Sequence, residues 1–398
     1  MNAKTQQKLW TASFISISIA SLFLTVTNYM TNSTFSLYVK FLGSTASVSG
    51  LSTTLFSIAN VIARLVSGRM ADKSGRKTVL LMGGIAYTIP AVVFGFSHSI
   101  PFLLVMRFIQ GYGYAAFNSC QNILASDSIP EERMGEGMGY FSTSLALASA
   151  FGPQLALSLL GESRFLLVYL VMAAICIAAL ILSFVCIAKG TVSYEKKGNA
   201  AKESLSEFLH GAFEKRAVPC GLVAFMCYLS FSAILTFLTL YSTERGFEHC
   251  GLFFTISAVT MFVTKIASGK MSDKYGTATV MVPTILIGAA NFVILSFTHS
   301  ETVFLICGAI HGVFLASILP VMTAVAVKRS PADRRGSAIC TFYIFVDVGV
   351  GIGALLWGLL IDSFNFGVMF MIGAAFLVVA AILCIAFFKN EKKQVSKN

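Results

Sequence analysis

Three ionisable side chains lie inside long apolar stretches of the chain: Arg107, His311 and Asp347. Burying a charged carboxylate among apolar groups is unfavourable, and binding a proton removes the charge. An imidazole binds and releases a proton near neutral pH. Asp347 and His311 could therefore carry protons. The guanidinium of Arg107 stays charged and could attract an anionic group.

Structural explanations exist for the same three residues. Asp347 could form a static ion pair with a neighbouring base, and His311 could be a neutral, hydrogen-bonded residue. Arg107 lies about 9 Å into its segment, so its side chain could extend to the lipid headgroups. Arg64 and Lys265 occupy equivalent positions near the ends of two segments, and we expect both to reach the membrane interface in this way.

Polar residues recur every three or four positions in segments 11–37 and 101–126, which places each set on one helix face. Such stripes can hydrogen-bond neighbouring helices, but two of them favour a polar cavity. The predicted cavity residues are Asn28, Asn32, Arg107, Gln110, Tyr114, Asn118, Gln121 and Tyr343. Segment 11–37 contains no acidic residue, so a neutral, zwitterionic or anionic ligand fits better than a strictly cationic one.

The composition indicates how these residues are positioned. The chain of 398 residues is 56% hydrophobic and only 12% charged, with a mean hydropathy of +0.79. Apolar segments of about 20 residues are what a bilayer requires of spanning helices. The predicted spans are 11–37, 46–66, 78–97, 101–126, 135–160, 165–188, 218–241, 250–268, 278–297, 302–327, 336–361 and 366–388.

Most of the 29 Lys and Arg residues fall in the termini and in alternate loops on one side. The positive-inside rule then makes both termini cytoplasmic. The net charge of +11 reflects this topology and contact with anionic lipids, and it does not indicate nucleic-acid binding. The 9 cysteines show no metal-ligand spacing, so we expect no metal and no cofactor. No cleavable signal peptide is evident.

The chain contains an internal repeat. Ser67, Gly68, Met70, Asp72, Lys73 and Gly75 recur about 200 residues later as Ser268, Gly269, Met271, Asp273, Lys274 and Gly276. The same spacing relates Pro130, Arg133 and Gly135 to Pro331, Arg334 and Gly336. Two equivalent apolar halves are typical of transporters whose halves move about a central site. We expect an amino-terminal bundle at 1–188, a cytoplasmic linker at 189–217 and a carboxy-terminal bundle at 218–398.

The loop after the second span resembles the signature of the major facilitator superfamily, Gly-x-Leu-Ala-Asp-Arg-x-Gly-Arg-Lys. Met70 and Lys73 are its only departures. The resemblance implies a gate at the cytoplasmic side, formed by Gly68, Asp72, Gly75, Arg76 and Lys77 together with Asp127 at the end of the fourth span. The alternative is a solvated basic turn. The second copy has Thr277 and Ala278 in place of the Arg-Lys pair, so its gate should be weaker.

Two further segments are similar to signatures of the same family. Arg107, Gln110 and Gly111 match a fourth-helix motif of proton-coupled members, and this resemblance implies that Arg107 takes part in proton coupling. Gly152-Pro153 is the surviving centre of an exporter motif, in which Ala148, Ala156 and Leu157 replace the other glycines.

The resemblance implies an all-α integral membrane protein with twelve transmembrane helices in two pseudo-symmetric six-helix bundles. We expect a monomeric transporter in the cell membrane of a bacterium that exports a small organic molecule in exchange for protons. A proton symporter or facilitator that imports a metabolite is the alternative. A membrane-embedded enzyme or sensor is remote, because the sequence shows no nucleophile elbow, phosphate loop or metal cluster.

Overall fold

The computed structural model describes residues 9–388 except 75, 131–132, 162, 189–212 and 332–333. Within the described helices, the side chains of 67–74, 76, 135, 142–143, 145–146, 186–188, 266–270 and 272–274 are not described.

Twelve long α-helices form the described part of the chain, and each corresponds to a predicted span. The amino-terminal bundle contains α1 (Ala12–Phe41), α2 (Ala46–Ser74), α3 (Arg76–Phe94), α4 (Ile100–Asp127), α5 (Met134–Leu160) and α6 (Phe165–Ala188). The carboxy-terminal bundle contains α8 (Val218–Arg245), α9 (Cys250–Tyr275), α10 (Thr277–Phe297), α11 (Glu301–Arg329), α12 (Arg335–Ser363) and α13 (Phe366–Phe388). Ten of the described helices are long and apolar enough to cross a membrane, and α5 and α9 contain shorter apolar stretches at Leu147–Leu160 and Cys250–Lys265.

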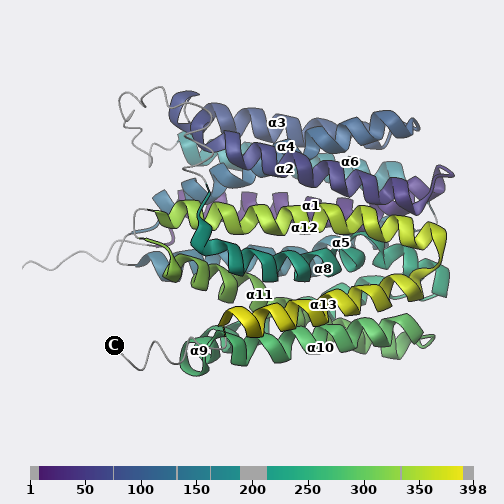
Figure 1. Cartoon of the computed structure of the whole chain (residues 1–398). Helices are drawn as coiled ribbons and strands as arrows, with labels where there is room; N and C mark the ends of the chain where they lie inside the picture. Colours follow the sequence, from purple (N-terminus) through teal and green to yellow (C-terminus); the bar gives the residue numbers. More distant parts are fainter. Residues whose placement is uncertain are drawn as a thin grey trace, which may run out of the picture.

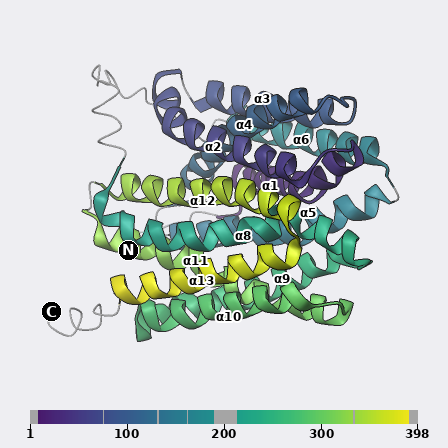
Figure 2. The same ribbon diagram turned by 45° about the vertical axis from the view of Figure 1, so that its right-hand side comes forward.

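The helices lie side by side with their axes roughly parallel, α1–α6 mostly above α8–α13 (Figure 1). We call the end at which α6 ends and α8 begins the linker end, and the opposite end, where α12 turns into α13, the far end. These ends lie to the left and right in Figure 1, and Figure 2 shows the same order of helices after rotation.

Helices α2 and α9 are longer than predicted. They continue to Ser74 and Tyr275, whereas the apolar spans were predicted to end at 66 and 268. Hydropathy identifies the part of a helix that lies in lipid, and the backbone hydrogen bonds of a helix continue into the polar segment that follows.

Each bundle has its own apolar core. The carboxy-terminal bundle is packed around large buried side chains that include Phe237, Phe304 and Trp357. Two clusters form the core of the other bundle, one around Tyr87 and Phe117 and one around Phe94 and Tyr169. This division supports the two-bundle organisation.

The end of the predicted linker belongs structurally to the carboxy-terminal bundle. Residues Lys215–Ala217 form a short 3₁₀ helix, η2. Glu214 is 5% exposed, its backbone N–H donates to Thr341 Oγ1 at 2.9 Å, and its carboxylate lies 3.1 Å from Arg334 Nε. The described residues at the end of the predicted linker therefore pack on the carboxy-terminal bundle, because a buried, paired glutamate holds them there.

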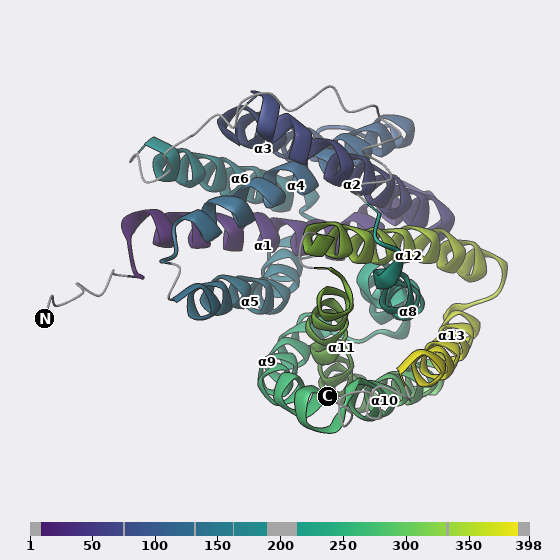
Figure 3. The same cartoon turned by 60° about the vertical axis from the view of Figure 1, so that its left-hand side comes forward.

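The bundles meet along two seams, α2 with α12 and α5 with α9, and α1 packs on α8 between them. Figure 3, in which the helices are seen more nearly end-on, shows α12 lying against α2. Small residues allow this approach. A methyl group added at Gly351 would lie 2.9 Å from Ser57 Cβ, and one at Gly358 would lie 2.8 Å from Ser47 Cα.

Several hydrogen bonds between described residues of the two bundles lie in the half of the molecule nearer the far end, and the Arg64–Asp347 ion pair lies near the middle. Asp362 on α12 caps the start of α2, where its Oδ1 accepts from the Ala46 N–H at 2.9 Å and its Oδ2 from the Ser47 N–H at 2.8 Å. Thr54 donates to the Gly351 carbonyl at 2.7 Å. The bundles are therefore joined at the far end.

Candidate functional site

Asp347 forms an ion pair with Arg64 across the α2–α12 seam. Arg64 Nε lies 2.7 Å from Asp347 Oδ2, and the two side chains are 22% and 12% exposed. Both residues lie about 15 to 18 Å along their helices from the linker end, at 1.5 Å per residue. Of the two explanations for Asp347, the structure contains the ion pair. The expectation that Arg64 extends to the membrane interface is wrong, because α12 brings a carboxylate within its reach.

Three tyrosines neighbour this ion pair, and a fourth, Tyr29, neighbours two of them. The ring of Tyr343 lies 5.1 Å from Arg64 Cζ. Tyr114 interacts electrostatically with Arg64, Asp347 and Tyr343. Tyr228 interacts in the same way with Asp347, Tyr343 and Tyr29. Helices α4, α8 and α12 thus place phenol groups beside one pair of opposite charges, and α1 adds Tyr29 next to two of these phenols. We call this group the central site: Arg64, Asp347, Tyr29, Tyr114, Tyr228 and Tyr343.

Arg107 lies in a second polar cluster, inside the amino-terminal bundle. It is 1% exposed, and its guanidinium donates to Gln110 Oε1 at 2.7 Å and to Asn32 Oδ1 at 3.1 Å. Its Cζ lies 5.0 Å from the centre of the Phe35 ring and 4.6 Å from that of Phe56. These contacts exclude the alternative in which Arg107 extends to the lipid headgroups, because the side chain is directed into the bundle.

The charge of Arg107 is not balanced by a described acidic residue. None of the ion pairs between described residues includes it, and its buried Nε has no hydrogen-bond partner. A buried cation held only by amides and aromatic rings costs stability, and such residues in membrane proteins usually have a functional role.

His311 lies in an aromatic enclosure in the carboxy-terminal bundle and is 2% exposed. Its ring stacks on Phe231 with centroids 5.7 Å apart, and Phe253 and Phe314 contact it from other sides. Its Nδ1 has no hydrogen-bond partner in the described part of the chain. Between described residues, no interaction joins His311 to Asp347.

The other predicted cavity residues separate into different environments. Asn28 interacts with Tyr114 and so borders the central site. Asn118 accepts a hydrogen bond from Asn122 on its own helix at 2.9 Å. Gln121 is fully buried and donates to Ser183 on α6 at 3.2 Å, so it joins two helices of one bundle.

The predicted gating motif falls largely outside the described residues. This applies to Gly75 as a whole and to the side chains of Asp72 and Arg76, while Gly68 is described only as part of α2. Lys77 is exposed, and its Nζ lies 5.3 Å from the centre of the Phe184 ring. Asp127 is exposed at the end of α4.

The exporter-like motif brings α5 against α1. Pro153 lies inside α5. A methyl group added at Gly152 would lie 2.7 Å from Tyr29 Cβ, so only a glycine allows the two helices to pack this closely there.

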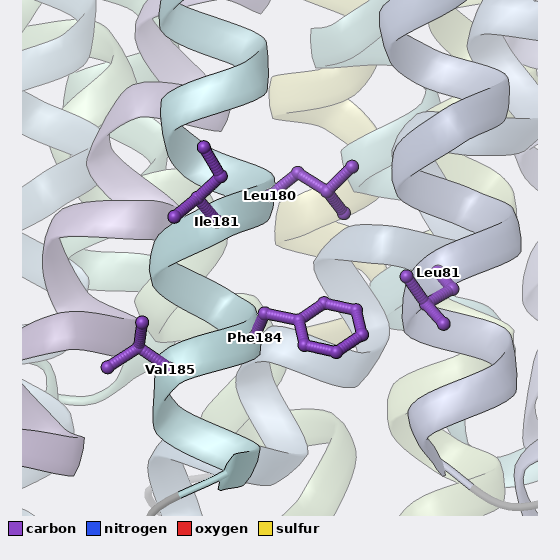
Figure 4. A pocket seen from close by; sticks show the side chains of 5 residues that line it. All are labelled: Leu81, Leu180, Ile181, Phe184 and Val185. Carbon is purple, nitrogen blue, oxygen red and sulfur yellow. The ribbon is translucent and has the colours of Figure 1, made fainter.

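A groove of about 320 Å³ lies away from the central site, between α3 and α6. It is lined by Leu81 on α3 and by Leu180, Ile181, Phe184 and Val185 on α6 (Figure 4). The lining contains no polar side chain, so nothing in this groove could orient a polar ligand.

Sequence reasoning missed Arg64 as the partner of Asp347, and it did not identify Tyr29 or Asp362. A cation inside an apolar segment was the available signal for Arg64. No periodicity indicates that α2 and α12 are neighbours, so the pair itself could not be predicted. No group of three or more described His, Cys, Asp or Glu residues could hold a metal ion.

Known proteins resemble this chain over nearly its whole length. The profile of the Major Facilitator Superfamily matches residues 17–253 and 220–398. The staphylopine export protein of Staphylococcus aureus is 22% identical, over 88% of this chain and 89% of its own. The multidrug resistance protein MdtG of Dickeya zeae is also 22% identical, over 89% of this chain and 90% of its own.

A solved structure shows the same fold. The crystal structure of a POT family transporter in complex with 5-aminolevulinic acid aligns with a TM-score of 0.81, at 13% identity, over 94% of this chain and 95% of that one. At this identity the likeness concerns the arrangement of helices alone.

Proposed function

We propose that this chain, which belongs to the Major Facilitator Superfamily, exports a small organic molecule in exchange for protons by alternating access. Export is supported by the names of two relatives, one a staphylopine exporter and one a multidrug resistance protein. In this proposal the linker end and both termini face the cytoplasm, the protein acts as a monomer, and the ligand enters from the linker end while the far end is closed.

One observation carries this proposal: the buried Arg64–Asp347 pair joins the two bundles near the middle of the helices. Opposite charges that have left water are held together strongly, and a proton on Asp347 removes that attraction. Protonation would therefore weaken a contact between the bundles. A substrate that requires ionised Asp347 would be released at the same step. Because the proton and the substrate cannot both be bound at Asp347, binding of a proton is coupled to release of the substrate.

The remaining predicted residues have supporting roles in this proposal. Arg107 supplies positive charge within the amino-terminal bundle, and its hydrogen bonds to Asn32 and Gln110 hold the guanidinium in place. The motif around Asp72 and Arg76 closes the cytoplasmic side together with Asp127. Gly152 and Pro153 let α5 pack on α1 during the motion.

The test uses the purified protein in liposomes with an imposed pH gradient and a panel of labelled drugs, metabolites and peptides. We expect at least one compound to move against its own gradient when protons flow the other way. Asp347→Asn should abolish the dependence on the pH gradient. Glu301→Gln is the matched control, because Glu301 pairs with His249 at the far end within one bundle.

Two results would contradict the proposal. Transport by Asp347→Asn with unchanged proton dependence would remove Asp347 as the proton carrier. Movement of substrate and protons in the same direction would indicate the importing symporter, the alternative considered from the sequence.

A further inference from the structure

We infer that the central site recognises zwitterions, meaning small molecules that carry both an ammonium and a carboxylate group. This inference rests on the proposed function and narrows its substrate class. The juxtaposition that carries it is the incomplete ion pair between Arg64 and Asp347 beside tyrosines from both bundles.

The ion pair uses only part of what its two side chains offer. One hydrogen bond joins Arg64 Nε to Asp347 Oδ2 at 2.7 Å. No other hydrogen bond between described residues uses the two terminal nitrogens of Arg64 or Oδ1 of Asp347. An arginine has five N–H donors, so four of them, on the terminal nitrogens, can still bind a carboxylate. Oδ1 can still accept from an ammonium group.

Charge balance selects the class of ligand. Arg64 and Asp347 together carry no net charge, and they lie where the chain crosses an apolar medium. A ligand with a single charge would leave one unbalanced charge in that medium, which is costly. A zwitterion adds no net charge and gives each protein charge an opposite neighbour. A neutral polar ligand could occupy the unused donors and acceptor only through weaker hydrogen bonds, because it brings no opposite charge to either of them.

The tyrosines suit both ends of such a molecule. The ring of Tyr343 already lies 5.1 Å from the cationic Cζ of Arg64, and an ammonium group can bind an aromatic face in the same way. The hydroxyls of Tyr29, Tyr228 and Tyr343 make no hydrogen bond to other described residues, so they remain available to a carboxylate or a polar side chain. They come from both bundles, and a ligand bound among them would contact both.

The same arrangement explains how a proton could displace the substrate. Ionised Asp347 holds the ammonium group through a charge-assisted hydrogen bond. Once the carboxyl group is protonated, this attraction is lost and the ligand retains only its carboxylate contact with Arg64. Proton and ammonium therefore compete for one carboxylate.

The test measures binding to the purified full-length protein in lipid nanodiscs, by calorimetry. The probes are L-phenylalanine, L-leucine, L-methionine and dipeptides made from them. Each is compared with its carboxamide, which lacks the carboxylate, and with its N-acetyl form, which lacks the ammonium. We expect at least one zwitterion to bind about tenfold or more tightly than both of its blocked forms, as the loss of a charged hydrogen bond predicts.

Variants separate recognition from a structural role. With Arg64→Gln the zwitterion and its carboxamide should bind equally, and with Asp347→Asn the zwitterion and its N-acetyl form should bind equally. Arg64→Lys keeps the charge and should restore part of the preference. If the pair only held the bundles together, each variant would weaken all three probes by the same factor.

A panel in which no zwitterion binds better than both of its blocked forms overturns the inference. That result together with proton-driven transport of a neutral compound would leave the proposed function intact. Zwitterion binding without proton-driven transport would support the zwitterion site and contradict the proposed exchange of substrate for protons.

Discussion

Arg107 is held within its bundle by neutral groups, and this makes it different from Arg64. Its partners are the amides of Asn32 and Gln110 and the rings of Phe35 and Phe56. Arg64 instead pairs with a carboxylate of the other bundle. A charge without an ionic partner lowers stability, so substitutions of Arg107 can separate its effect on stability from its proposed role in transport.

Two substitutions of Arg107 should rank oppositely in stability and in transport. Arg107→Met removes the buried charge, whereas Arg107→Lys keeps it and cannot reach Asn32 and Gln110 with a planar fork. We expect the Met variant to unfold at the higher temperature and to transport at least about tenfold more slowly than the Lys variant. Thermal unfolding and liposome transport measure the two quantities.

Lys40→Met is the control for this pair of variants, because Lys40 is an exposed cation near the end of α1. It should change neither quantity. A Met variant that transports as well as the wild-type protein would show that the charge of Arg107 is dispensable.

A substitution of His311 can show whether this residue or Asp347 carries the proton. Its ring lies among Phe231, Phe253 and Phe314, and a phenylalanine would preserve this stacking while removing a buried nitrogen that has no partner. We expect His311→Phe to be at least as stable as the wild-type protein and to keep its dependence on the pH gradient. Loss of that dependence with normal folding would make His311 a carrier beside Asp347.

At the scale of elements, the carboxylate of Asp362 on α12 caps the first amides of α2, and this contact between the two bundles lies at the far end. The first amides of a helix have no partner within it, and a carboxylate there satisfies them and interacts favourably with the helix dipole. Because Asp362 belongs to the other bundle, this cap also holds the two bundles together.

Asp362→Asn should loosen the far end. A weakened cap at an exposed site costs about 0.5–1 kcal/mol, which corresponds to about twofold to fivefold more frequent opening. We expect faster hydrogen exchange of the amides at 46–57 and 350–360, measured by mass spectrometry. Glu301→Gln, which disturbs a contact within one bundle, should leave these peptides unchanged. Equal exchange in both variants would show that the cap does not hold the seam.

The sequence predicted where the helices begin and end better than it predicted which helices pack against each other. The spans were predicted to within a few residues at most helix ends, because apolar length decides them. Arg64 and Gln121 show where this information ends. Arg64 was assigned to the interface and Gln121 to a cavity, yet the first meets Asp347 and the second meets Ser183. Both outcomes depend on which helices are adjacent, and a stripe on one helix does not contain that information.

The whole molecule is less symmetric than its repeated sequence. The α2–α12 seam contains an ion pair, a helix cap and the Thr54–Gly351 hydrogen bond. On the α5–α9 seam, the Thr255 hydroxyl lies 3.4 Å from the carbonyl of Ala150. Lys265 occupies the position equivalent to Arg64, but Ala146 stands where the other half has Asp347. The Arg64–Asp347 combination is therefore not repeated at the equivalent positions 265 and 146, so the proposed proton step belongs to the α2–α12 seam.

If the bundles must separate at the far end for transport, a covalent link there should stop it. Ser36 on α1 and Thr239 on α8 are suitable, because their hydroxyl oxygens lie 3.4 Å apart across the two bundles. We expect the double variant Ser36→Cys/Thr239→Cys to lose transport after oxidation and to regain it after reduction. Each single variant should transport in both conditions, which controls for the native cysteines. Full transport by an oxidised double variant, with the cross-link verified by mass spectrometry, would mean that α1 and α8 stay together throughout the cycle, and alternating access by separation of the bundles would have to be abandoned.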